Sequence, residues 1–459
     1  MPSPFSRTTL PTIATAIGLA LASGLLGGCQ TAAPDGVDDG PLAATEDTAD
    51  APTAAALAPA PMPPFRVEVD PQPIVVAPDL AHLQARARGG DAQAQAELGE
   101  RLHTGRDLRR DDRQALVWLR RAAARGSLDA RVELARMQAL GHGVRRNPAK
   151  ALELMRDAAT GGHPAAQLAL GEALETGTDL KQDQAAALEW YRRAAEQGLA
   201  QAQFRLATMF EHGRGTARDE ALAIAWYRKA ARRRHPHAQT NLAVMIDAGR
   251  GTAAEPREAL AWFREAALAG FDLAEFNLAL ALETGRGTPA DLDEAAYWYR
   301  RAAERGDASA QYRLATLTDA GQGVAQDDRE ASRWYRSAAA LGHAGAMSRL
   351  AARYQYGTGL PRDPIAALAL LELSSAAGHG VSREARDSLA RTLGGSGVDA
   401  AGALARALSA PGRFEQVLAS RNGERDASLP SVPEARLVDA RAPIPERAWR
   451  AQAKAPRPE

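Results

Sequence analysis

The chain of 459 residues contains one cysteine, Cys29, and only 5% aromatic residues. With a single cysteine, no disulfide framework and no thiolate zinc cluster can form within the chain. Lys plus Arg and Asp plus Glu number 56 each, so the formal net charge is zero. This balance argues against a nucleic-acid-binding protein, which normally carries a basic face. After residue 30, no apolar run approaches the roughly 18 residues that a membrane-spanning helix needs.

The N-terminus has the features of a secretory leader. Arg7 provides a positive start, an apolar stretch follows over Ile13 to Leu26, and the stretch ends in Leu26-Gly27-Gly28-Cys29. This ending resembles the lipobox of bacterial lipoproteins. The resemblance implies that residues 1–28 are a signal peptide that is removed, and that Cys29 becomes lipidated and anchors the chain to a membrane. An ordinary secretory leader that happens to contain a cysteine is the alternative.

Gln30 follows the predicted lipidation site. In the sorting pattern of such lipoproteins an aspartate there favours inner-membrane retention, so Gln30 favours the periplasmic face of the outer membrane. Residues 29–78 are predicted to form a disordered linker, because the stretch Gln30–Phe65 is rich in Ala and Pro and contains no Lys or Arg. Its acids are Asp35, Asp38, Asp39, Glu46, Asp47 and Asp50.

Internal repetition determines the predicted fold. Eight units of 36 residues follow one another without insertion over residues 90–377. Each unit has an alanine at its fourth offset (Ala94 to Ala346), a leucine at its eighth (Leu98 to Leu350) and a glycine at its fifteenth. Six of the seven tryptophans share one further offset: Trp118, Trp190, Trp226, Trp262, Trp298 and Trp334. A fixed period of this length indicates stacked, identical supersecondary units.

Each unit is predicted to form two helices, here named helix A and helix B. The alanine and leucine columns place an apolar stripe on helix A, and the glycine that follows can adopt the left-handed conformation that ends it. Helix B then begins at an acid or amide whose side-chain oxygen can accept free backbone N–H groups. These predicted N-caps are Asp111, Asn147, Asp183, Asp219, Glu255, Asp291, Asp327 and Asp363.

The unit G-x-x-x-A-Q-x-x-L-(G/A)…G-x-G…D…A-x-x-W-Y-R-x-A-A resembles the Sel-1-like repeat, a relative of the tetratricopeptide repeat. Clear copies are Gly198–Ala231 and Gly306–Ala339. We therefore expect an all-α, right-handed superhelical solenoid of helix-turn-helix repeats over residues 79–393, including a capping helix at each end. A mostly disordered tail is expected over residues 394–459, with a short helix near Ala400–Ser420.

Three residues depart from the glycine pattern of the turns. Arg234 replaces the opening glycine of the fifth unit, and Asp107 and Asp179 replace the second loop glycine of the first and third units. The G-x-G pairs lie between two helices and not after a strand, so they are turn glycines and not a dinucleotide-binding fingerprint.

The sequence contains no catalytic motif and predicts no cofactor, no metal site and no small-molecule substrate. Several histidines occur in turns and are interpreted as solvated loop residues: His142, His163, His212, His235, His237 and His343. The pair His235 and His237 could touch a metal, but two ligands without a third make a weak site. Some proteins of the resembled family have been assigned β-lactam hydrolysis, but those have disulfide-stapled repeats, which this chain lacks.

Two charged columns recur at fixed offsets. The arginine column of helix B is interpreted as long stems that cover apolar surface; its members are Arg120, Arg156, Arg192, Arg228, Arg264, Arg300 and Arg336. Acids near the end of helix A are unfavourable with the helix dipole, so they need a partner. Pairing with arginines of the adjacent unit is favoured over binding to a basic partner for Glu175, Glu211, Asp247, Glu283 and Asp319.

The candidate binding residues share one outward offset of helix A, which tends to line the concave face of such solenoids. They are Arg205, Asn241, Asn277, Arg313 and Arg349. This polar, partly basic ladder suits a peptide or an acidic glycan, while ordinary solvated surface is the alternative. The predicted function is a non-enzymatic scaffold for protein partners in the cell envelope. Binding to the cell wall or to an exported polysaccharide is the second hypothesis.

Overall fold

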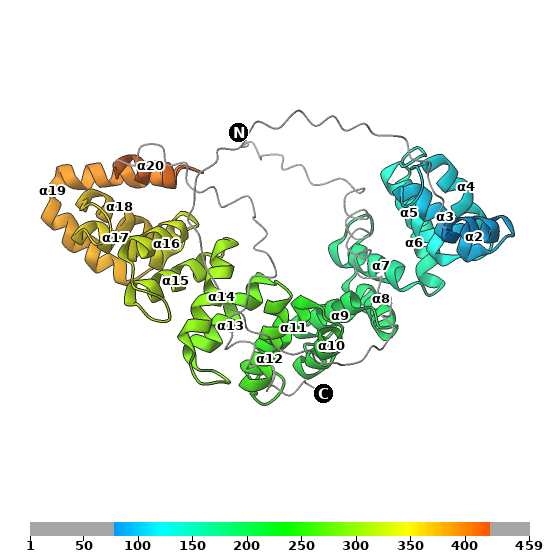
Figure 1. The fold of residues 1–459 in the computed structure, drawn as a ribbon, viewed down its shortest axis with the longest axis horizontal. Coiled ribbons are helices and arrows are strands. Elements are labelled where there is room, and N and C mark those ends of the chain that lie inside the picture. Colours follow the sequence, from blue (N-terminus) through cyan, green and yellow to red (C-terminus); the bar gives the residue numbers. More distant parts are fainter. Residues whose placement is uncertain (1–77, 423–459) are drawn as a thin grey trace, which may run out of the picture. The chain divides into compact units, whose positions relative to one another are not determined.

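The computed structural model describes residues 78–422. Cys29, the predicted leader 1–28, nearly all of the predicted linker and the tail from residue 423 lie outside the described residues. The described part of the chain consists of 19 helices without any strand (Figure 1). It divides at Lys181 into two compact units, each of which is a stack of helices with its own core. The all-α solenoid predicted from the repeats is confirmed.

In the first unit, a capping helix is followed by alternating A and B helices, and each helix packs against the next one along the chain. The helices are α2 (Pro78–Arg88), α3 (Ala92–Thr104), α4 (Asp112–Ala124), α5 (Leu128–Leu140), α6 (Pro148–Thr160) and α7 (Pro164–Thr176).

The second unit continues the alternation, beginning with a B helix. Its members up to the last repeat are α8 (Gln184–Glu196), α9 (Ala200–His212), α10 (Glu220–Arg232), α11 (Pro236–Asp247), α12 (Pro256–Leu268), α13 (Asp272–Thr284), α14 (Leu292–Glu304), α15 (Ala308–Ala320), α16 (Asp328–Ala340), α17 (Ala344–Tyr356) and α18 (Pro364–Ala376). Two further helices follow, α19 (Val381–Leu408) and α20 (Phe414–Arg421).

The predicted helix starts are confirmed in every repeat. All eight predicted residues occupy the N-cap of their B helix, and seven of them accept a backbone N–H with the side chain. Glu255 occupies the cap of α12 without such a bond, and glutamate is not among the residue types that are preferred at an N-cap. The residue at which each B helix begins can therefore be read from the position of its capping residue in the sequence.

The three departures from the glycine pattern all adopt the conformation of the glycine that they replace. Asp107, Asp179 and Arg234 are the non-glycine residues with positive φ among the described residues, at 59°, 67° and 59°. This region is disfavoured for residues with a Cβ, at a cost of roughly 1 kcal/mol or more. The turn geometry is thus set by the repeat stacking and overrides local preference.

The columns that define the repeat also form the core. Every member of the alanine and leucine columns of helix A is buried. Trp262 and Trp298 are buried, and the other four repeat tryptophans are half-buried, so none of the six is an exposed residue. Tight packing of small alanines beside large aromatic rings closes each seam between neighbouring helices.

The C-terminal end of the helical region differs from the expectation. The boundary predicted at residue 393 falls inside α19, which kinks at Gly394 (φ 69°, ψ −176°) and continues to Leu408. Helix α20 then packs against α19 and α16 and buries Phe414 and Leu418. The glycine-rich stretch is a bend in a helical cap and not the start of a tail.

Candidate functional site

The five candidate binding residues lie on helices α9, α11, α13, α15 and α17, where all but the exposed Arg349 are half-buried. Asn241 Nδ2 donates to the Tyr227 hydroxyl at 3.2 Å, and Asn277 Nδ2 donates to the Leu273 carbonyl at 2.7 Å. Arg313 lies 3.5 Å from Glu283. A hydrogen bond with Tyr312 raises the pKa of Arg349. Asn241, Asn277, Arg313 and Arg349 therefore each contact a neighbouring side chain or backbone carbonyl.

The acidic column of helix A pairs with arginines of the following repeat, as predicted. In the second unit, Glu211 binds Arg250 at 2.9 Å, Asp247 binds Arg286 at 2.5 Å, Glu283 binds Arg313 at 3.5 Å and Asp319 binds Arg353 at 2.5 Å. The acidic column and the candidate binding ladder thus meet in the Glu283–Arg313 pair. Each of these carboxylates links its own repeat to the following one. This link explains why acids are present at the C-terminus of a helix, where the helix dipole disfavours them.

Buried tyrosine hydroxyls complete this seam. The Tyr227 hydroxyl donates to Glu211 at 2.6 Å, and the Tyr299 hydroxyl donates to Glu283 at 2.6 Å. Burial, and secondarily the adjacent carboxylate, raises the pKa of both phenols far above the ordinary value, so they stay protonated and donate at any physiological pH. The sequence analysis missed this contact. Its signal was available, since a tyrosine follows the repeat tryptophan wherever the acid is a glutamate in this unit.

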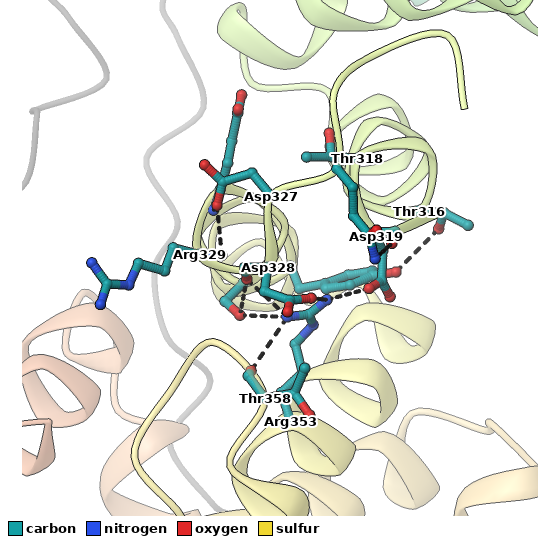
Figure 2. Close-up of polar contacts among 12 residues, drawn as sticks. Thr316, Thr318, Asp319, Asp327, Asp328, Arg329, Arg353 and Thr358 are labelled. Atoms are coloured by element: carbon teal, nitrogen blue, oxygen red, sulfur yellow. Dashed lines mark hydrogen bonds and ion pairs between the residues drawn. The ribbon is translucent and has the colours of Figure 1, made fainter. Parts of the chain in front are cut away.

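Arg353 forms the most extensive polar contact of the second unit (Figure 2). Its side chain is 5% exposed, and its guanidinium binds Asp319 at 2.5 Å and Asp328 at 3.5 Å. It also donates to the Asp328 carbonyl, the Ser332 hydroxyl and the Thr358 carbonyl at 2.8, 2.9 and 3.3 Å. One side chain on α17 thereby joins the end of α15, the start of α16 and its own following loop.

The arginine column of helix B forms a second set of inter-repeat contacts, which the interpretation as stems that cover apolar surface did not include. Arg228 binds Glu258 at 3.0 Å, Arg264 binds Glu294 at 3.0 Å and Arg300 binds Glu330 at 3.2 Å. Each glutamate lies in the first turn of the next B helix. Arg336 instead binds Glu415 of α20 at 3.0 Å, so the terminal helix replaces the missing next glutamate.

The same glutamates bind the repeat tryptophans. The indole N–H groups of Trp262, Trp298 and Trp334 donate to the glutamate four residues earlier at 3.2, 3.1 and 3.2 Å. Each of these carboxylates therefore accepts from its own helix and from the preceding repeat. A recurring glutamate four residues before the tryptophan was the sequence signal for this contact.

Three turn histidines are N-caps of helix A, and their interpretation as solvated loop residues is wrong. Nδ1 of His163, His235 and His343 accepts a backbone N–H at 3.2, 3.2 and 3.1 Å. The rings of His235 and His343 also stack on Phe204 and Tyr312, with centroid distances of 4.8 and 4.5 Å. Only the neutral imidazole can accept at Nδ1, so these caps require uncharged rings.

We expect the His235 cap to make the free energy of unfolding depend on pH. Burial, together with nearby His237 and Arg205, lowers the pKa of His235 from 6.5 to about 4. Above about pH 6.5 the ring is neutral in both states, and between about pH 6.5 and 4 only the unfolded chain gains the proton, so stability falls as the pH falls. The loss has an upper bound of about 3 kcal/mol, reduced to roughly 2 by partial exposure.

Denaturant unfolding of the wild type and of His235→Asn at several pH values measures this effect. Asparagine also caps helices but does not titrate, so the variant should lose less stability between about pH 6.5 and 4. Parallel pH curves would contradict the assignment.

The part of the chain that the structure describes contains neither a metal-binding cluster nor a membrane-spanning helix. Within residues 78–422, no group of three His, Cys, Asp or Glu side chains is arranged to hold a metal ion. None of the helices in this range combines the length and the apolarity that crossing a bilayer requires. The polar side chains described above connect neighbouring repeats, and the A helices present a partly polar surface on which a partner could bind.

Comparisons with known proteins agree with this picture. The sequence model described as Sel1 repeat matches eight contiguous segments, at residues 92–127, 128–163, 164–199, 200–235, 236–271, 272–307, 308–343 and 344–379. Comparison with curated protein sequences finds no match.

Among solved structures, the chain is similar to a Sel1 repeat protein from Oxalobacter formigenes at 30% identity, covering 72% of this chain and 98% of that one, with a TM-score of 0.50. It is also similar to the protective antigen c5321 of uropathogenic Escherichia coli, which displays an SLR fold, at 25% identity, covering 76% and 98%, with a TM-score of 0.45. Sel1 repeats generally act as non-enzymatic modules for protein–protein interaction. With eight matching repeats in succession, the chain belongs to the Sel1-repeat family.

Proposed function

We propose that the protein is a lipid-anchored scaffold that binds a polypeptide partner along the A helices of its second unit, on the periplasmic face of the outer membrane. The observation that carries the binding part is the exposure of apolar side chains on these helices. Val244 on α11 is 39% exposed and Leu273 on α13 is 47% exposed, and Asn241 and Asn277 lie on the same two helices.

This combination suits a peptide. Apolar side chains supply contact area, and each amide can accept as well as donate, so a side chain that already donates retains acceptor capacity for a backbone N–H. The surrounding charges largely satisfy one another, since the acidic column pairs with arginines of the next repeat. The surface therefore favours a polypeptide over a strongly charged ligand. Binding to the cell wall or to an exported polysaccharide is the alternative function.

The anchor part of the proposal depends on the lipobox-like sequence Leu26-Gly27-Gly28-Cys29 and on Gln30 after it. A diacylated or triacylated Cys29 would attach the chain stably, because two or more acyl chains suffice for this. The stretch from Gln30 to Phe65 contains acids but no Lys or Arg, which suits a solvated tether between anchor and repeats.

One experiment tests both parts. The full chain is crosslinked in intact envelopes of the source bacterium and purified, and its partners and its mature N-terminus are identified by mass spectrometry. We expect defined protein partners and an acylated Cys29. Retention of glycan without protein would support the alternative function, and an unmodified N-terminus elsewhere would contradict the anchor.

Matched variants locate the binding surface. Val244→Asp and Leu273→Asp place a charge on the A helices and should abolish recovery of the partner. Leu341→Asp is the control, because Leu341 is a 57% exposed apolar residue that follows a B helix, α16. Equal recovery by all three variants would contradict the proposed surface.

A further inference from the structure

Helix α20 fixes the place from which residues 423–459 continue the chain. It packs on α16 and α19 (Figure 1). Its last residue, Arg421, binds Asp363 at 2.6 Å, and the Tyr354 hydroxyl donates to the side chain of Asn422 at 3.1 Å. Because Tyr354 belongs to the last turn of α17, Asn422 lies beside the end of this helix, and the residues that follow begin there.

The last residue of the same helix presents an aromatic ring to solvent. Tyr356 is 74% exposed, although it lies only two residues after the buried Tyr354. Ala352, one turn earlier on the same face, is also exposed, and it occupies the repeat position that Val244 has on α11. The ring of Tyr356 thus extends the exposed surface of the A helices to the end of α17.

This tyrosine is peculiar to the last repeat of the second unit. The equivalent residues of α9, α11, α13 and α15 are His212, Ala248, Thr284 and Ala320. Since the other repeats pack with these smaller or more polar residues, repeat stacking does not require a tyrosine here. The exposed ring occurs in the repeat beside which residues 423–459 begin.

A positive charge lies beside the ring. Arg362 Nε donates to the Gln355 carbonyl at 3.2 Å, which places this exposed arginine against the end of α17. No acid of residues 78–422 forms an ion pair with Arg362. The single acid of the loop after α17, Asp363, is bound by Arg421. An apolar segment with an acid nearby therefore complements this end of the helix.

Ala352, Tyr356 and Arg362 together form the Tyr356 surface. We propose that the segment Leu429–Pro433 of the same chain docks on this surface. The segment reads Leu-Pro-Ser-Val-Pro, so it offers two branched apolar side chains and two prolines. Proline-rich segments bind aromatic surfaces at a low entropic cost, because proline restricts the unbound chain. Both the surface and the segment belong to the unit Gln182–Glu459.

The connection to Asn422 is long enough for this docking. Leu429 follows Asn422 by seven residues, and an extended chain of that length spans roughly 25 Å. A helix with its side chains is about 10 to 12 Å across, so the segment can reach the exposed face of α17. Two acids of the connection, Glu424 and Asp426, can approach Arg362. Being attached beside the surface, the segment also has a high effective concentration.

Docking of this kind would cover the exposed ring and occupy the last A helix of the second unit. A partner that extends along the A helices to α17 would then have to displace the segment. Docking requires neither lipidation at Cys29 nor binding at α11 and α13, so it goes beyond the proposed function and can be tested without it.

Disulfide trapping in the full chain tests the proposal. In a Cys29→Ser background, Ala352→Cys places one thiol on α17 and Ser431→Cys places the other within the segment. A disulfide forms only where the two Cα atoms come within about 7 Å of each other. We therefore expect the two thiols to link readily under mild oxidation, and absence of this link would overturn the proposal.

A matched pair of substitutions distinguishes docking from chance encounters of a tethered segment. Tyr356→Ser removes the ring and should slow the link about tenfold, because burial of one large apolar side chain changes an equilibrium by at least this factor. Leu341→Ser removes a 57% exposed side chain from the turn after α16 and should leave the rate unchanged. Equal rates in the two variants would overturn docking on the Tyr356 surface.

The segment has a matched control of its own. Leu429→Ser should slow the link as Tyr356→Ser does, whereas Ile444→Ser changes an apolar residue beyond the segment and should not. Equal slowing by both would overturn the assignment to Leu429–Pro433. In an equal mixture of isotopically labelled and unlabelled chains, the linked peptides should come from one chain, and links of mixed composition would overturn docking within the chain.

Discussion

Replacement of Arg353 by methionine is expected to lower the free energy of unfolding by about 3 to 4 kcal/mol. The variant keeps most of the apolar stem but removes every donor of the guanidinium. Asp319 loses its ion-pair partner, and the Asp328 carbonyl and the Ser332 hydroxyl each lose a hydrogen bond. Because these groups lie around a nearly buried side chain, water cannot fully replace the missing donors.

Arg349→Met is the matched control for this substitution. Arg349 lies one turn earlier on α17 and is exposed, so its loss should cost no more than about 1 kcal/mol. Urea denaturation of the full chain, followed by circular dichroism and tryptophan fluorescence, measures both variants. Equal destabilisation by the two substitutions would show that Arg353 does not join the repeats in the way described.

Gly323→Ala is expected to lower the free energy of unfolding by about 3 kcal/mol. Gly323 has a φ of 67°, and a Cβ built there would lie 2.1 Å from the Leu292 carbonyl oxygen. Alanine therefore adds both left-handed strain and a backbone clash between one repeat and the start of the preceding B helix. The turn would have to move away from that helix and open the seam.

Gly306→Ala separates these two causes. Gly306 has a φ of 93° with no atom within 4 Å of a Cβ built there, so alanine adds strain alone, at about 1 kcal/mol. Thermal and urea unfolding of both variants should give a clearly lower free energy of unfolding for Gly323→Ala than for Gly306→Ala. Equal costs would mean that the close approach of the two backbones is not maintained in solution.

Much of this molecule is predictable from sequence because one physical arrangement is repeated eight times. The N-caps from Asp111 to Asp363 and the pairing of acids such as Glu211 with the next repeat all follow from residues at constant offsets. The pattern also applies to positions that depart from it in residue type, since Asp107, Asp179 and Arg234 adopt the positive φ of the glycine that they replace. In a repeat protein, most tertiary contacts join adjacent repeats, so they can be predicted from residues at constant offsets.

Features that occur in only some repeats, or outside them, were not predicted. Glu258, Glu294 and Glu330 recur in three units only, and their arginine partners lie 30 residues earlier on another helix. A histidine such as His235 can be a cap or a solvated residue with the same sequence spacing, and only the position of its ring distinguishes the two. Helix α20 has no periodic counterpart, so its docking through Glu415 and Arg421 depends on tertiary contacts.

The contacts between B helices also bear on how such a chain can change over evolutionary time. Arg228, Arg264 and Arg300 each bind an equivalent glutamate on the next B helix, so the same ion pair occurs at three successive interfaces between repeats. Loss of a whole 36-residue segment would bring Arg228 to another glutamate of the same kind, whereas an insertion of any other length would change the spacing of the pair that spans it. Copy number can therefore vary in whole units without an unmatched charge appearing in the interior.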